Sequence, residues 1–144
     1  MTDPKSECEK VMNSVLPFAE EMLTKHREFL PFGGTMSADG EIAQMAGWAN
    51  DEYPPSAEVI DVLERGFRAG AQAGDYKATA LVYDILTTPP GKEDKQDAIA
   101  IALDHRDNYS VIVIFPYSFT ADDQLEIETP IAIQGKNKIF TQPP

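Results

Sequence analysis

Cysteine, histidine and basic residues are all scarce in this chain, and each scarcity argues against a kind of chemistry. The single cysteine, Cys8, cannot form a disulfide within the chain and provides no redox pair. The two histidines, His26 and His105, lie far apart, and neither a His-x-x-x-His nor a Cys-x-x-Cys spacing occurs. Without either spacing, the sequence does not indicate a zinc site. We therefore expect neither a metal nor a cofactor.

Long apolar segments are also lacking. The first ten residues, MTDPKSECEK, contain no apolar stretch of the kind found in signal peptides. No later run approaches the roughly 18 apolar residues that a membrane-spanning helix needs. We therefore expect a cytoplasmic protein.

The chain is poor in bases relative to acids. It has 12 Lys and Arg against 24 Asp and Glu, a formal net charge of −12. A surface of this sign repels phosphate backbones and anionic lipid head groups, so we expect no nucleic acid and no membrane as a partner. It speeds encounter with a basic protein, although such a charge also simply keeps a protein soluble.

The pattern of apolar residues predicts two helices within a single domain over residues 1–144. Apolar residues recur at helical spacing at positions 8, 11, 12, 15, 18, 19, 22 and 23, and again between 57 and 73. Pro17 falls inside the first stripe, where it predicts a kink or a restart of the helix. Ser56 precedes the second and is expected to cap it.

In other segments apolar and polar residues alternate with the period of two that is typical of strands. We predict six strands, over residues 29–36, 41–48, 77–87, 97–104, 109–117 and 126–134. The fourth and fifth are apolar on both faces, as central strands covered on both sides are. The predicted fold is α+β: a mostly antiparallel sheet of five or six strands with two main helices packed on it.

A polar stretch from Asp104 to Asn108 separates these two central strands. We interpret it as a hairpin turn with a four-residue loop, which places Asp104 opposite Tyr109. Adjacent residues at a strand end point in opposite directions, so we do not expect Asp104 and His105 to form a catalytic dyad.

One face of the strand over residues 97–104 carries the small side chains of Ala98, Ala100 and Ala102. They leave room for a helix to approach closely. Gly66 and Gly70, inside the second predicted helix, are the expected points of approach because a glycine has no side chain to keep the two backbones apart.

No motif marks an enzyme active site. Neither phosphate-binding glycine loop occurs, and no nucleophile elbow surrounds a serine. We therefore name no catalytic, cofactor-binding or metal-binding residue. Trp and Tyr are enriched in interface hot spots and are also common at the edge of a core. The candidate interaction residues are the aromatic side chains near segment ends: Phe32, Trp48, Tyr53, Tyr117 and Phe119.

Three local patterns resemble an uncharacterised family of small bacterial proteins: Phe29-Leu-Pro-Phe-Gly33, Asp39-Gly-Glu41 and Asp97-Ala-Ile-Ala-Ile101. That resemblance covers most of the chain and implies no assigned activity. The order of helix, hairpin, helix and three strands is also similar to roadblock and profilin-like domains. This second resemblance implies a non-catalytic dimerising scaffold or regulator.

These observations predict a non-catalytic protein-interaction domain with an acidic surface. It would act as a homodimer or with a basic protein partner, as scaffold proteins and immunity or antitoxin-like proteins do. The alternative is a small hydrolase or a small-molecule-binding protein, with a pocket near Trp48 or near the turn from Asp104 to Asn108.

Overall fold

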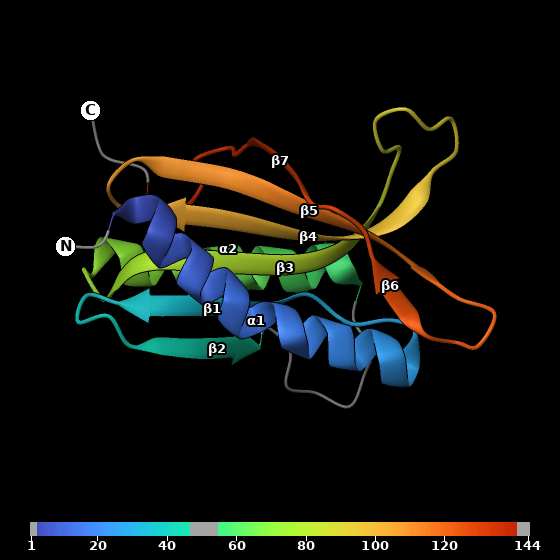
Figure 1. Ribbon diagram of the computed structural model, residues 1–144. Coiled ribbons are helices and arrows are strands. Elements are labelled where there is room, and N and C mark those ends of the chain that lie inside the picture. The colour runs from blue at the N-terminus through green and yellow to red at the C-terminus, as the bar shows by residue number, and fades with distance from the viewer. Residues whose placement is uncertain (1–2, 47–54, 141–144) are drawn as a thin grey trace.

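Seven antiparallel strands form a sheet with a helix packed on each side of it (Figure 1). The computed structural model describes residues 3–46 and 55–140. In chain order the elements are α1 (Pro4–His26), β1 (Phe32–Ser37), β2 (Ile42–Ala46), α2 (Ser56–Gln72), β3 (Tyr76–Thr87), β4 (Gln96–His105), β5 (Tyr109–Phe119), β6 (Leu125–Ile127) and β7 (Ile131–Gln134). The predicted α+β class, with two helices on an antiparallel sheet, is confirmed.

The strands follow the order β2-β1-β3-β4-β5-β6, and β7 also pairs with β5. Strand β4 lies between β3 and β5, and β5 lies between β4 and the two strands β6 and β7, so both apolar strands have neighbours on each side, as predicted. The predicted strand over 126–134 is wrong in one respect, because it forms two strands that pair with different parts of β5. Pro130 lies in the interruption, where its missing N–H cannot continue a ladder.

Helix α1 buries a stripe of residues three or four positions apart against one face of the sheet: Cys8, Val11, Val15, Ala19 and Leu23. Its first turn is capped by the Asp3 carboxylate, which accepts a hydrogen bond from the Ser6 N–H at 2.7 Å. The helix runs through Pro17 without a break, so the alternative of a restart was wrong. Packing of the stripe on the sheet supports the helix on both sides of the proline.

Helix α2 covers the opposite face through Val59, Leu63 and Phe67. The expected cap at Ser56 was wrong, because Ser56 is the first helical residue and Pro55 occupies the cap position without a side-chain hydrogen bond. Proline is well suited to a helix start, where its missing N–H would be unpaired in any case.

Both helices pack tightly against β1 at two adjacent glycines that face opposite sides of the sheet. A side chain at Gly33 would overlap the Phe67 ring of α2, and a Cβ at Gly34 would lie 2.6 Å from Val15 Cγ1 of α1. The predicted approach through Gly66 and Gly70 over the alanines of β4 was wrong. Gly66 lies near Met45 and Gly70 lies against the Tyr76 ring, because α2 packs on β1 and β3 rather than on β4.

The hairpin between β4 and β5 has a three-residue loop, so the predicted four-residue loop was wrong. His105 pairs with Tyr109, and Asp104 pairs with Ser110. Asn108 closes the loop with a backbone φ of 68°, a left-handed conformation that asparagine tolerates better than most residues. The shorter loop shifts every pair between the two strands by one residue on β5.

Candidate functional site

Three polar residues lie side by side across the sheet on the face that α2 covers. Thr79 of β3 is the register partner of Asp104 of β4, which in turn is the partner of Ser110 of β5. Alternation along a strand places such partners on the same face. All three line a cavity of about 220 Å³, which we call the α2 pocket.

The floor of the α2 pocket is apolar. The next row of register partners on this face is Leu81, Ala102 and Ile112. Ala102 has the smallest side chain of the three, so the cavity is deepest over β4. The small side chains that were expected to admit a helix therefore leave room for a cavity instead.

The other walls come from α2 and from the segment after β7. Ile60, Glu64 and Phe67 of α2 form one wall. Residues 135–139 form another, and there Lys136 and Lys138 are exposed whereas Ile139 is buried. The pocket thus has an apolar body, one buried polar end and exposed lysines at its rim.

Asp104 is the most deeply buried carboxylate of the pocket, with 8% of its surface exposed. Its Oδ1 accepts a hydrogen bond from the Ser110 hydroxyl at 2.8 Å, and the Ser110 oxygen accepts one from the Asn137 N–H at 3.1 Å. Burial raises the pKa of Asp104 above its ordinary value and the negative charge of Glu64 raises it further, whereas the hydrogen bond from Ser110 lowers it.

Thr79 is 1% exposed, and its hydroxyl has no hydrogen-bond partner among the residues that the structure describes. Such an isolated buried hydroxyl is costly, by about 1–3 kcal/mol relative to a paired one. An unsatisfied group beside a cavity is a natural contact for a bound molecule.

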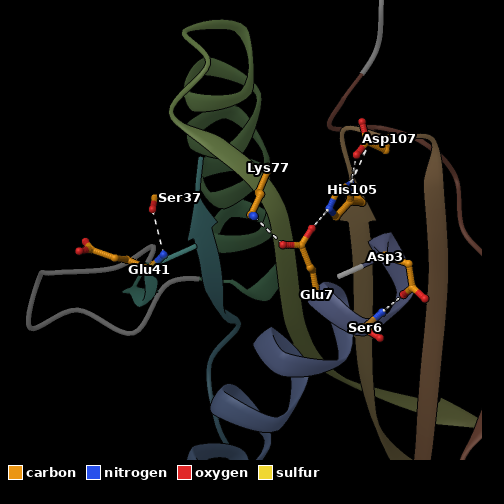
Figure 2. A network of polar contacts seen from close by, with 8 residues as sticks. All are labelled: Asp3, Ser6, Glu7, Ser37, Glu41, Lys77, His105 and Asp107. Atoms are coloured by element: carbon orange, nitrogen blue, oxygen red, sulfur yellow. Dashed lines mark hydrogen bonds and ion pairs between the residues drawn. The ribbon is translucent and has the colours of Figure 1, made fainter. Parts of the chain in front are cut away.

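His105, which follows Asp104, points to the opposite face and lies in a closed polar network (Figure 2). Its Nε2 is 2.9 Å from Oε1 of Glu7, and the other Glu7 oxygen is 2.5 Å from Lys77 Nζ. Its Nδ1 accepts a hydrogen bond from the Asp107 N–H at 3.0 Å, which leaves Nε2 to donate to Glu7. As predicted, Asp104 and His105 do not pair.

The Glu7–His105–Lys77 network ties the start of α1 to β3 and β4. His105 is 2% exposed and Glu7 is 7% exposed, and both ring nitrogens of the histidine are engaged. The imidazole is thus buried between α1 and the sheet, and its hydrogen bond with Glu7 links the helix to β4.

Three of the aromatic residues named from the sequence are described by the structure, and two of them, Tyr117 and Phe119, are in edge-to-face contact with ring centroids 6.1 Å apart. Phe32 and Tyr117 are buried in the core, where the Tyr117 hydroxyl donates a hydrogen bond that the two carboxylate oxygens of Asp84 share. Phe119 is half-buried beneath the Arg27 guanidinium. The remaining two candidates, Trp48 and Tyr53, lie outside the described residues. A role in interaction stays a prediction for this group.

Metal and membrane sites find no support in the described ranges, 3–46 and 55–140. No group of three or more His, Cys, Asp or Glu side chains there could hold a metal ion. No helix of this part of the chain is long and apolar enough to cross a membrane.

Burial also raises the pKa of Cys8 to about 12, which keeps its thiol protonated and unreactive.

The chain has no match among known protein families, curated proteins or solved structures. The interpretation of the α2 pocket therefore depends on its geometry and chemistry.

Proposed function

We propose that this protein binds a small molecule in the α2 pocket and does not catalyse a reaction on it. The observation that carries the proposal is the unpartnered hydroxyl of Thr79, placed beside the buried carboxylate of Asp104 in a cavity with an apolar floor. Binding sites for small molecules characteristically combine apolar walls with a few convergent polar groups.

The arrangement around Ser110 supports binding rather than hydrolysis. A nucleophilic serine needs a base that removes its proton, usually a histidine held by a third group. Here the Ser110 hydroxyl donates to Asp104, and the nearest histidine in the sequence, His105, faces the other side of the sheet. The pocket has binding groups without an activated nucleophile.

The size of the cavity limits the ligand. An apolar protein cavity of about 150 Å³ accommodates benzene. By the same ratio, a cavity of about 220 Å³ holds a molecule of roughly nine non-hydrogen atoms. This is the size of a small metabolite or signal molecule.

The protein-interaction role expected from the composition stays a second proposal. The net charge of −12 supports it, since this charge favours encounter with a basic partner. Phe32 and Tyr117, two of its five candidate residues, are buried in the core.

The binding proposal can be tested by screening fragments of up to about nine non-hydrogen atoms against the isotope-labelled protein by NMR. We expect hits to shift the backbone amide signals of pocket residues such as Leu81, Ala102 and Ile112. Ala102→Leu, which fills the floor, should abolish these shifts, whereas Ala132→Leu on the exposed surface of β7 should preserve them. The proposal fails if no fragment shifts these signals, or if Ala102→Leu binds the same fragments equally well.

A further inference from the structure

Resting on the proposed function, we infer that the ligand is a small amine that binds as its ammonium ion. Its charged group would lie between Asp104 and Thr79, and its apolar body would lie over the floor of the α2 pocket. Three observations lead to this class of ligand.

The first is the distribution of charge with depth. Asp104 is 8% exposed at the buried end of the pocket, whereas Lys136 and Lys138 are exposed at its rim. Lys138 Nζ also lies 3.8 Å from Oε2 of Glu64, which partly neutralises that lysine. A cation entering the pocket therefore meets a carboxylate in a poorly solvated place, where electrostatic attraction is strong. An anion meets opposite charge only at the rim.

The second is the hydrogen-bonding capacity of the buried end. An ionised carboxylate is only an acceptor, and a threonine hydroxyl can accept as well as donate. An ammonium group has three donors and no acceptor, so one such group can serve both Asp104 and Thr79. The two residues are direct register partners in antiparallel strands, which places their Cβ atoms about 5 Å apart. We therefore place the nitrogen of the inferred ligand between these two side chains.

The third is the apolar body. Leu81, Ala102 and Ile112 form the floor, and Phe67 and Ile60 lie on the opposite wall. These side chains favour an aromatic or branched aliphatic group. 2-Phenylethylamine, with an aromatic ring, a two-carbon linker and a primary amine, is a suitable probe of about the size that the cavity holds.

Calorimetric titration of the protein at pH 7 with three probes of similar size tests the inference. We expect 2-phenylethylamine to bind at least about tenfold more tightly than neutral 2-phenylethanol, since hydrogen bonds to a charged group are worth about 1.5–3 kcal/mol. Phenylacetate, an anion, should bind most weakly. If the alcohol or the acid binds the pocket as tightly as the amine, the amine inference is wrong and the pocket remains a binding site. If none of the three binds and the fragment screen is also negative, the proposed function itself is wrong.

Variants locate the binding group. Asp104→Asn should weaken amine binding at least about tenfold and change alcohol binding little. Asp39→Asn, at the exposed turn between β1 and β2, changes the net charge equally and should leave amine binding unchanged. Undiminished amine binding by Asp104→Asn would overturn the inference.

A second variant serves if Asp104→Asn does not fold. Thr79→Val keeps the shape of the side chain and removes the unpartnered hydroxyl, so we expect amine binding to weaken about fivefold, the loss of one ordinary hydrogen bond. Unchanged amine affinity in Thr79→Val would show that the nitrogen does not contact this end of the pocket, against the inference.

Discussion

Asp104 and His105 are consecutive residues of β4, yet the two faces of the sheet place them in different environments. On the α1 face, His105 has both ring nitrogens engaged, in a network with Glu7 and Lys77. On the α2 face, Asp104 lines a cavity beside the hydroxyl of Thr79, which has no partner among the described residues. The polar groups of the network on the α1 face bond to one another, and we propose that a bound molecule contacts those of the α2 face.

The same contrast holds for the apolar residues. On the α1 face, Ile99, Ile101 and Leu103 are fully or almost fully buried against the stripe of the helix. On the α2 face, the corresponding residues of β4 are alanines, and α2 packs over the neighbouring strands. A rigid, well-packed face supports a site on the other side of the same strands, because a pocket needs a floor that does not move.

The largest expected effect is on the α1 face. Glu7→Ala removes the carboxylate shared by Lys77 and His105 and leaves the buried histidine and the partly buried lysine without it. Breaking a buried ion pair in this way costs about 3–5 kcal/mol. We expect a loss of this size in the free energy of unfolding, measured by urea denaturation.

Glu21→Ala is the matched control, since Glu21 forms an exposed ion pair with Lys25 in the same helix. It should leave the denaturation midpoint almost unchanged, because exposed pairs contribute little. Equal midpoint shifts for both variants would show that the network does not hold α1 on the sheet.

Truncation of one leucine on each face compares the packing of the two faces directly. Leu103, 1% exposed, packs in the α1 core, whereas Leu81 lines the α2 pocket. Leu103→Ala leaves a new closed cavity and should cost about 3–5 kcal/mol. Leu81→Ala enlarges an existing cavity and should cost about 2–3 kcal/mol, since fewer packed contacts are lost. Urea denaturation measures both, and an equal or larger loss for Leu81→Ala would contradict the difference between the faces.

The smallest expected effect is a pH dependence on the α2 face. Burial raises the pKa of Asp104, so the folded protein keeps this proton over a pH range where the unfolded chain has lost it. Its contribution to the free energy of unfolding therefore falls as the pH rises above about 4, the ordinary range of an aspartate. Asp104→Asn cannot ionise and should gain stability relative to the unliganded wild type between pH 3 and pH 7.

Urea denaturation at several pH values measures this difference. Asp39→Asn, with the same change of net charge at an exposed turn, corrects for the general effect of charge. A stability difference between Asp104→Asn and the wild type that does not change with pH would show that Asp104 is not destabilised by burial.

Most of the fold and part of the candidate site could be predicted from the sequence. The spacing of Cys8, Val11 and Val15 indicated the helix that packs on the sheet. Residues three or four positions apart lie on one side of a helix, so an apolar stripe at this spacing is buried when that side packs against the rest of the protein. The pocket near the turn from Asp104 was an alternative prediction. Thr79 was missed, since an alternating strand contains many similar threonine positions and only its pairing with Asp104 distinguishes this one.

The sequence by itself determined which segments become helices and strands and that Asp104 and His105 face opposite ways, since local periodicity dictates both. Only the tertiary structure decided what each of them meets. Glu7 reaches His105 across 98 positions of the chain, and Asn108 sets the loop length that pairs Asp104 with Ser110. These contacts depend on register and on the packing of distant segments. Neighbouring residues in the sequence do not specify such long-range pairing.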